Sequence, residues 1–475
     1  MRKELGSGTD NIDGTLENSE GSPPVKSSLE RDWTKGNIFL NILSLSWPMA
    51  ISNLLMSIGP TIDMIWVGKL GSASVAGVGV AGIGVQVIMV AIWSLMVGMR
   101  AMIARFVGAG DNEGPNQVAQ QALVVCAVFA ASMAVIGMFL SEEILSLFGL
   151  EEDVIQEGAD YLRILFVGSV VMCIRMVTDA GMQASGDVVT PMRIAVFYRL
   201  FHVALCPFLI FGWWIFPEMG VKGAATTNII SQSMGTAIGM WFLFTGRTRL
   251  KLTLKNFRID PRIIWRMVKV GLPALVSGVQ KTFTGFIFMW IIAPFGTAAV
   301  AAHTVGQRIE MFLFMPGMAF GMAAGVMVGQ NLGAKQPERA EKSSWLAVAI
   351  VEGIMIVCSI ILLLWAEQIV GIFNQEPELV EIASGFLRIA VVGYTVLAFP
   401  AVLMSALSGA GDTIPGMIIE IIATWLISMP LAYFLPKLTG LGVYGIRWGL
   451  VAGMLASTSA VLFYFRLGRW KHKKV

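Results

Sequence analysis

The sequence predicts an all-α integral membrane protein with twelve transmembrane helices in two homologous six-helix lobes. An apolar composition, long apolar runs and an internal repeat lead to this prediction. Of the 475 residues, 56% are hydrophobic and only 14% are charged, and the mean hydropathy is +0.72. Soluble domains carry roughly a quarter charged residues, so this chain could not cover a water-exposed surface and is expected to be solvated largely by lipid.

Apolar runs long enough to cross a bilayer recur along the chain. A hydrocarbon core about 30 Å thick requires roughly 20 apolar residues per helix. The runs are too long and too continuously apolar for the strands of a membrane barrel. We expect spans at 40–67, 73–103, 118–140, 160–183, 193–215, 222–245, 266–292, 299–328, 343–365, 383–407, 416–435 and 443–465.

The second half of the chain repeats the first with a shift of 225 positions. The segment Val107-Gly108-Ala109 matches Leu332-Gly333-Ala334, and Gly186-Asp187 matches Gly411-Asp412. This indicates duplication of a six-helix unit. Because six is even, both copies insert in the same orientation, and a pseudo-two-fold axis along the membrane normal should relate them. Transporters built from such parallel repeats bind substrate between the lobes.

Charge and composition divide the chain into five parts. We expect a disordered cytoplasmic tail at 1–36, an N-lobe at 37–245, a basic cytoplasmic linker at 246–265, a C-lobe at 266–465 and a basic cytoplasmic C-terminus at 466–475. By this assignment most of the 34 Lys and Arg residues lie on one side of the membrane. The positive-inside rule therefore places both termini in the cytoplasm, in a multi-pass protein of the cell (inner) membrane. The same rule explains the basic patches, so we expect no nucleic-acid partner. The sequence shows no strong dimerisation signal, and we expect a monomer.

An ordered set of motifs resembles one transporter family. The first helix reads L-S-W-P-M-A and ends in T-I-D-M-I-W-V-G-K-L-G (61–71), and V-G-Q-N-L-G-A-K-Q-P-E-R-A follows at 328–340. Over roughly 38–468 the chain is similar to the multidrug and toxic compound extrusion (MATE) family. The resemblance implies two lobes arranged as a V, and efflux of cationic or amphipathic small molecules in exchange for protons or sodium.

Asp63 is the first candidate for the coupling site. An ionisable side chain within a membrane span is costly and needs a functional or structural reason. Asp63 follows Gly59-Pro60, where we expect the helix to be broken or bent. It also matches the aspartate of the family's first-helix motif. We therefore expect Asp63 to bind and release the coupling cation, with capping of a neighbouring helix as the alternative.

Three further residues are expected near Asp63. Where one branch of the family has Asn and Asp four residues apart in the fifth helix, this chain has His202 and Cys206, whose spacing places them on one helix face. Asn228 stands where the family often has a polar residue in the sixth helix. A histidine can relay a proton near neutral pH, whereas sodium prefers oxygen ligands. The substitution favours protons but leaves sodium open, and His202 could instead be a buried, hydrogen-bonded imidazole.

The second lobe also departs from the sodium-coupled branch of the family. Lys281 stands where that branch has a glutamate, and we expect it to pair with Glu310 of the neighbouring helix, since charged groups inside membrane bundles usually pair. The pair would be structural, or a gate, or a counter-charge for the substrate. Arg175 and Asp179 have the spacing of a local ion pair, and Arg199 is expected near a helix end, reaching the interface.

The remaining motifs bear on substrate and chemistry. Apolar contact and cation–π attraction would suit flat amphipathic cations between the lobes, with candidate lining residues Phe288, Met289, Phe312, Phe314 and Met315; a lipid-facing stripe is the alternative. The sequence holds no G-x-x-x-x-G-K-[ST] and no H-E-x-x-H, so we expect neither an enzyme nor a cofactor or metal. A flippase for lipid-linked sugars of the same superfamily remains the alternative function. The identity of the substrate stays open.

Overall fold

The computed structural model describes residues 32–473, except for 147–148, 150 and 256, and the described chain is helical without a β-strand. The first 31 residues, which make up most of the expected disordered tail, lie outside it, as do 474–475. The first lobe contains α1 (Ile38–Val67), α2 (Ser72–Gly108), α3 (Gly114–Ser146), α4 (Glu152–Val167), α5 (Ser169–Ser185), α6 (Val189–Phe211) and α7 (Gly220–Thr245). The second contains α8 (Pro261–Ile292), η1 (Ala293–Phe295), α9 (Thr297–Gly333), α10 (Pro337–Gly371), α11 (Pro377–Tyr394), α12 (Ala398–Gly409), α13 (Thr413–Ile421), η2 (Ile422–Ser428), α14 (Met429–Leu438), α15 (Tyr444–Arg466) and η3 (Arg469–His472).

The twelve expected spans correspond to these helices, but two of the spans are bent. The fourth consists of α4 and α5, which meet at 47°, and the tenth consists of α11 and α12, which meet at 53°. Gly168 ends α4, and Pro400 lies in the first turn of α12, where a missing N–H leaves no intrahelical bond unmade. The eleventh span runs from Thr413 to Leu438 through the π-helical stretch η2.

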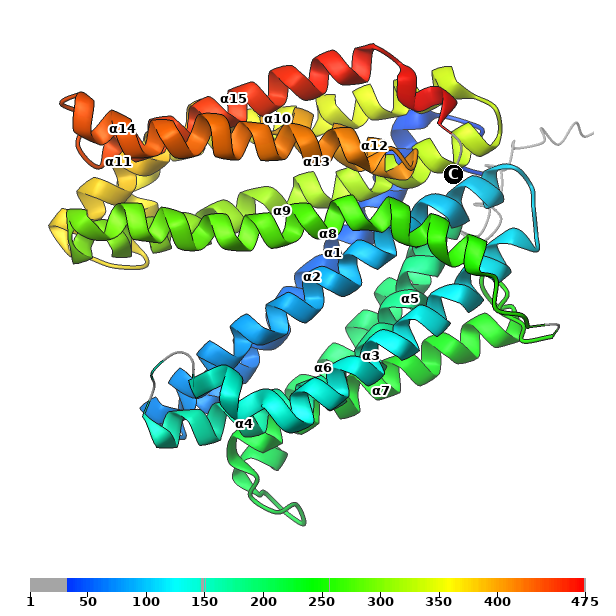
Figure 1. The fold of residues 1–475 in the computed structure, drawn as a ribbon, viewed down its shortest axis with the longest axis horizontal. Helices are drawn as coiled ribbons and strands as arrows, with labels where there is room; N and C mark the ends of the chain where they lie inside the picture. The colour runs from blue at the N-terminus through cyan, green and yellow to red at the C-terminus, as the bar shows by residue number, and fades with distance from the viewer. Residues whose placement is uncertain (1–31, 147–148, 150, 256, 474–475) are drawn as a thin grey trace, which may run out of the picture.

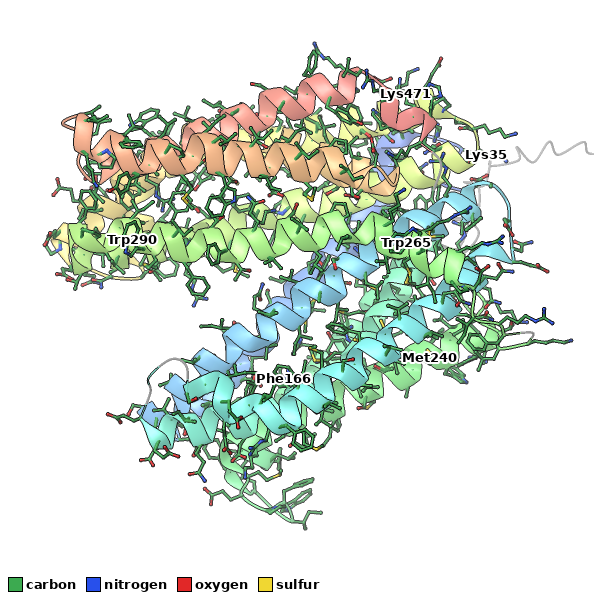
Figure 2. The ribbon with its side chains drawn as sticks, viewed as in Figure 1. Lys35, Phe166, Met240, Trp265, Trp290 and Lys471 are labelled. Atoms are coloured by element: carbon green, nitrogen blue, oxygen red, sulfur yellow. The ribbon has the colours of Figure 1, made fainter. Side chains whose placement is uncertain are left out.

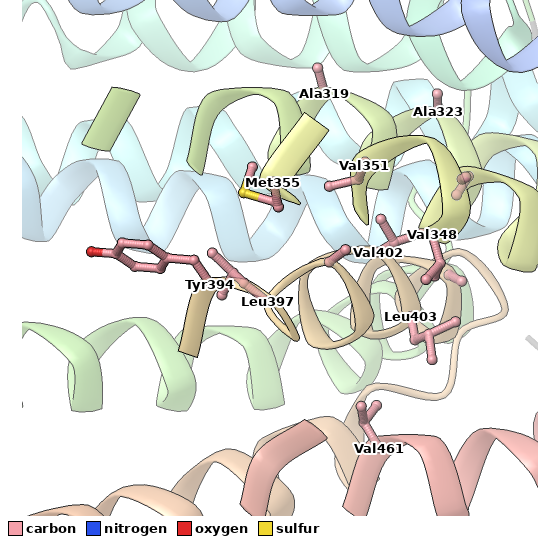
Figure 3. Close-up of a cluster of buried hydrophobic side chains, with 14 of the residues drawn as sticks. Ala319, Ala323, Val348, Val351, Met355, Tyr394, Leu397, Val402, Leu403 and Val461 are labelled. Carbon is pink, nitrogen blue, oxygen red and sulfur yellow. The ribbon is translucent and has the colours of Figure 1, made fainter. Parts of the chain in front are cut away.

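The two lobes form a V (Figure 1). They converge at the end that holds both ends of the described chain and separate toward the other end. At the convergent end α2 packs against α8 and α9, and α1 packs against α9. Each lobe has its own apolar core, and Figure 3 shows part of the second, where side chains of α9, α10, α12 and α15 meet. The first half of α1 contributes Ile42, Leu45 and Met49 to that core, so α1 links the lobes.

The internal repeat is visible in a reciprocal contact between α2 and α9. Gly108 packs so closely on the backbone of Gln330 that a Cβ would collide with the Gln330 carbonyl. Gly333 packs in the same way on the Arg105 carbonyl. Because 105 and 330, and 108 and 333, are equivalent in the 225-residue register, the pseudo-two-fold axis passes between these two helices.

Two exposed tryptophans on α8 mark the expected membrane interfaces. Trp265 and Trp290 are 65% and 68% exposed and lie near opposite ends of the helix (Figure 2). At 1.5 Å per residue they are about 37 Å apart along the axis, which brackets a hydrocarbon core of about 30 Å. Tryptophan gathers at both boundaries of that core. The basic linker lies at the Trp265 end, which is also the convergent end.

Buried tryptophans anchor the segments at both ends of the described chain. Trp33, inside the expected disordered tail, is buried, and its indole N–H donates to the Gly186 carbonyl at 3.1 Å. At the other terminus Trp470 is buried and stacks on Phe465 with ring centroids 4.7 Å apart. The expected tail boundary at 36 is therefore too late, because Trp33 covers the turn between α5 and α6. The linker is also shorter than the expected 246–265, since α8 begins at Pro261.

Candidate functional site

The N-lobe brings three of the four expected coupling residues together. Asp63 comes from α1 and His202 and Cys206 from one face of α6, and all three are fully buried. The His202 Nε2 lies 3.1 Å from Asp63 Oδ1, and the Cys206 thiol donates to the same oxygen at 3.7 Å. The other carboxylate oxygen, Oδ2, has no hydrogen-bond partner among the described residues. Asp63 also lines a cavity of about 320 Å³ inside the lobe.

A neighbouring arginine contacts one ring nitrogen of His202. Arg199 Nη1 lies 3.4 Å from His202 Nδ1, inside the same lobe. A guanidinium can only donate hydrogen bonds, so Nδ1 must present its lone pair. The ring nitrogen Nδ1 of His202 therefore faces a donor, and Nε2 is the ring nitrogen that faces Asp63. Neither Nε2 of His202 nor Oδ2 of Asp63 has a hydrogen-bond partner among the described residues, and the open oxygen Oδ2 is a place where a proton can be added.

The ligand atoms of Asp63, His202 and Cys206 all lie within 4.8 Å of one another, close enough to consider a metal ion. A metal would have to take the Nε2 lone pair of His202. The proton would then move to Nδ1 and face the Arg199 guanidinium, two donors with no acceptor between them. Sodium would meet one carboxylate, one thiol and one imidazole nitrogen, whereas it prefers oxygen ligands.

Asn228 lines the same cavity but does not join the cluster. Its amide oxygen accepts a hydrogen bond from Gln232 at 2.5 Å on its own helix, α7. The expectation that Asn228 directly accompanies Asp63 is therefore not met in this conformation. The cavity separates the two residues, and water or a ligand would have to bridge them.

Arginines surround Tyr198 at the wall of this cavity. The guanidinium carbons of Arg175 and Arg199 lie 4.7 and 5.2 Å from the Tyr198 ring centroid. Arg175 forms the expected ion pair with Asp179 and also donates to Gln232 at 3.4 Å. The expectation that Arg199 reaches the interface is wrong: it lies in the middle of α6 and is only 7% exposed.

The first helix was expected to be broken or bent at Gly59-Pro60, and it is not broken there. α1 runs without interruption from Ile38 to Val67 across Pro60, although proline leaves the Met56 carbonyl without its N–H partner. Gly59 instead has a packing role. The Arg199 guanidinium lies directly against it, where a Cβ would collide with Nη1, Cζ and Nη2. The absence of a side chain at Gly59 thus allows Arg199 to approach His202.

The C-lobe charges pair differently from our expectation. Lys281 pairs with Glu420 of α13 at 2.8 Å, and Glu310 pairs with Arg447 of α15 at 2.6 Å. The expected pair Lys281–Glu310 is therefore wrong, because each residue faces a different neighbouring helix. Arg447 was missed, although an arginine within an apolar span was itself a signal. It is 3% exposed, and its guanidinium carbon lies 4.8 Å from the Phe386 ring centroid.

A cleft of about 480 Å³ lies between α1, α2 and α9, where the lobes begin to separate. Among its lining residues are Asn53, Met56, Trp93, Glu310, Phe314 and Met315. Of the five expected lining residues, Phe314 and Met315 are at the cleft, while Phe288 is packed in a core with α14 and α15. Met56 lines both this cleft and the Asp63 cavity, so the two spaces adjoin across α1.

Two helical lobes that converge at one end, with a buried ionic site in one lobe and a cleft between them, define a membrane transporter. A family model described as MatE matches residues 48–208 and 273–434, and the two matches start 225 positions apart, as the internal repeat does. The matches cover more than half of the chain, which therefore belongs to the MatE family of multidrug and toxic compound extrusion proteins.

Relatives along nearly the whole chain agree with this assignment. The chain is 26% identical over 442 residues to the "Probable multidrug resistance protein NorM" of Thermotoga maritima, covering 91% of this chain and 93% of the relative. It is 24% identical over 393 residues to a "FAD transporter" of Shewanella oneidensis, covering 82% and 86%. Among solved structures, a MATE protein in the bent conformation has a TM-score of 0.87 at 24% identity, covering 94% of this chain and 98% of that chain, and it shares the fold.

Proposed function

We propose that this transporter is a secondary active antiporter that exports amphipathic or cationic small molecules in exchange for protons, by alternating access. The observation that carries the proposal is the 3.1 Å approach of His202 Nε2 to Asp63 Oδ1, beside a cavity. The names of the relatives, most of which contain "multidrug resistance", support this class of substrate for them. The cleft beside the cavity has methionine, aromatic and carboxylate lining, which suits amphipathic cations.

The proposed proton cycle needs two states of one carboxylate. In one state, ionised Asp63 faces Nε2 of His202 and accepts the thiol of Cys206. Protonation of Oδ2 removes the charge, so the attraction between α1 and α6 weakens. Since the first half of α1 is packed in the C-lobe core, a shift of α1 would be transmitted between the lobes. Exchange follows if substrate leaves the cleft in one of these states and binds in the other.

We place the protein in the cell (inner) membrane with both termini in the cytoplasm. The basic linker and the C-terminal segment lie at the convergent end of the V (Figure 1), and the positive-inside rule assigns this end to the cytoplasm. The V then opens to the outside, in the conformation from which an exporter releases substrate. Small molecules and membrane lipid are the proposed partners, and the protein is proposed to act as a monomer.

The test is ethidium efflux from proteoliposomes under separately imposed proton and sodium gradients. Asp63→Asn keeps the size of the side chain and removes its charge cycle. We expect wild-type efflux under the proton gradient and its loss in Asp63→Asn. Glu352→Gln is the matched control, since Glu352 is an intramembrane carboxylate of α10 that does not line the Asp63 cavity. Efflux by Asp63→Asn equal to that of the wild type would contradict the proposal. Efflux driven by the sodium gradient would mean that the coupling ion is sodium and not the proton.

A second candidate function rests on the arginines. Arg175 and Arg199 line the N-lobe cavity and Arg100 lines a smaller cavity between the lobes, which would suit an anionic substrate such as a lipid-linked sugar. The flippase alternative therefore has a structural argument, and the relative named "FAD transporter" would fit an anionic substrate too. Asp179 and the coupling carboxylate offset these charges, so the cationic class stays first. Movement of a fluorescent lipid-linked sugar without ethidium efflux would favour the flippase.

A further inference from the structure

A second charged cavity lies where the lobes meet, at the convergent end. It measures about 630 Å³ and is walled by the end of α2, the first turns of α8, the turn between α12 and α13, and the C-terminal segment. Four cationic side chains line it: Arg105, Arg266, Lys269 and Lys473. One carboxylate, Asp412, faces them. The cavity therefore holds an excess of positive charge, drawn from both lobes.

The carboxylate is already engaged. Asp412 Oδ1 lies 3.0 Å from the Lys473 Nζ, and Oδ2 accepts the Tyr464 hydroxyl at 2.6 Å. Arg266 and Lys269 form no ion pair with any residue in the described part of the chain. Arg105 uses Nη2 to donate to the Lys473 carbonyl at 2.7 Å, while its buried Nη1 has no partner among the described residues. Among the described residues, Arg105, Arg266 and Lys269 thus have no anionic partner.

The cavity lies at the level of the lipid headgroups. Trp265, next to Arg266 in the chain, is 65% exposed and lies at the same end of the molecule as Lys471 (Figure 2). Exposed tryptophan occupies the boundary between hydrocarbon and water. Arginine and lysine that converge there are suited to phosphate groups, which accept several charge-assisted hydrogen bonds.

We propose that this cavity binds a phosphate-bearing anion, supplied either by an anionic phospholipid or by free phosphate. Arg105 belongs to the N-lobe, and Arg266, Lys269 and Lys473 belong to the C-lobe, so the anion joins the lobes at the end where they converge. Its binding stabilises the conformation that is closed at this end. The inference concerns a site separate from the Asp63 cavity and stands whether or not the protein couples efflux to protons.

The test measures anion binding rather than transport. Full-length protein is purified in detergent, and native mass spectrometry records adducts with phosphatidylglycerol and with phosphatidylcholine; inorganic phosphate is titrated separately by thermal unfolding. The variant is Arg266→Gln with Lys269→Gln, two exposed residues of α8. The charge-matched control is Arg262→Gln with Arg466→Gln, which are also exposed and do not line the cavity.

We expect the wild type and the control to retain phosphatidylglycerol in preference to phosphatidylcholine, and the cavity variant to bind it about thirtyfold more weakly, since each interfacial Lys or Arg contributes about one factor of five. Stabilisation of wild type by inorganic phosphate, lost in the cavity variant, supports the site with free phosphate as its ligand. Equal weakening in the control, or no effect of either anion on the wild type, overturns the proposal. Arg266→Lys with Lys269→Arg, which keeps the charge, should bind like the wild type and excludes misfolding as the cause.

Discussion

Gly108 and Gly333 form a reciprocal contact across the pseudo-two-fold axis, each packed on the backbone of the partner helix beside the other. The contact holds α2 and α9 together at the convergent end, where the lobes meet. Neither backbone can move away as a flexible side chain could, so an added Cβ must separate the helices. The two glycines therefore belong to the contact that closes the convergent end, which we call the seal.

We expect Gly333→Ala to weaken that seal. Overpacking a close contact costs about 1–3 kcal/mol, and here the cost falls on the state that is closed at the convergent end. The midpoint of thermal unfolding should fall, and the distance between spin labels on α2 and α9 at this end should increase. Gly353→Ala on α10, where a Cβ would meet nothing within 4 Å, is the control. Unchanged label distances in Gly333→Ala would contradict the assignment of this contact to the seal.

Gly59 supports a second prediction, because the Arg199 guanidinium occupies the place of its missing side chain. In Gly59→Ala the Cβ displaces the end of a flexible arginine rather than a backbone, so the fold should survive. The displaced guanidinium would leave His202 Nδ1, and the imidazole would lose the contact that orients its Nε2 toward Asp63. We expect proton-driven efflux to fall at least tenfold, with little change in thermal stability. Gly79→Ala on α2, which has open space around it, should transport normally.

The sequence predicted the parts of the fold that depend on the bilayer and on the repeat. Runs of about 20 apolar residues can only be spanning helices, and a 225-residue register implies two equivalent lobes. The bends in the fourth and tenth spans could not be predicted in the same way, because Gly168 and Pro400 are also compatible with straight helices. Pro60 predicted a break or a bend, and of these two the structure excludes the break, because α1 continues through it.

The sequence could predict those features of the candidate site that depend on residue spacing within a single helix. The spacing of His202 and Cys206 predicted a shared face, and the cost of Asp63 in a membrane predicted a partner. Which charges pair between helices depends on helix rotation, which the sequence does not encode locally. For that reason Lys281 was assigned to Glu310 instead of Glu420, and Arg199 was placed at the interface instead of beside His202.

Arg447 gives a prediction about stability. It is the partner of Glu310 and lies 3% exposed in the C-lobe. Arg447→Gln would leave the Glu310 carboxylate without its counter-charge; breaking a fully buried pair costs about 3–5 kcal/mol, and the cost here should be smaller because Glu310 lines the cleft. We expect a clear drop in the unfolding midpoint, and a partial recovery in the double variant Arg447→Gln with Glu310→Gln, where no charge is left unpaired. If the double variant is as unstable as the sum of the two single variants, the pair does not act as a unit.

His202 gives the last prediction, which separates a fixed donor from a proton relay. Because the Arg199 guanidinium faces Nδ1, His202 presents Nε2 to Asp63, and we predict that it serves the carboxylate as a donor and does not carry the proton itself. A glutamine amide can replace that donor, whereas alanine cannot. We therefore expect His202→Gln to keep most of the proton-driven efflux and the wild-type dependence of efflux on pH. His202→Ala should lose about tenfold or more, since a hydrogen bond to a charged group contributes about 1.5–3 kcal/mol. Efflux of both variants across a pH series is the measurement. If His202→Gln were as inactive as His202→Ala, the imidazole would have to carry the proton itself, and the role assigned to Arg199 would be wrong.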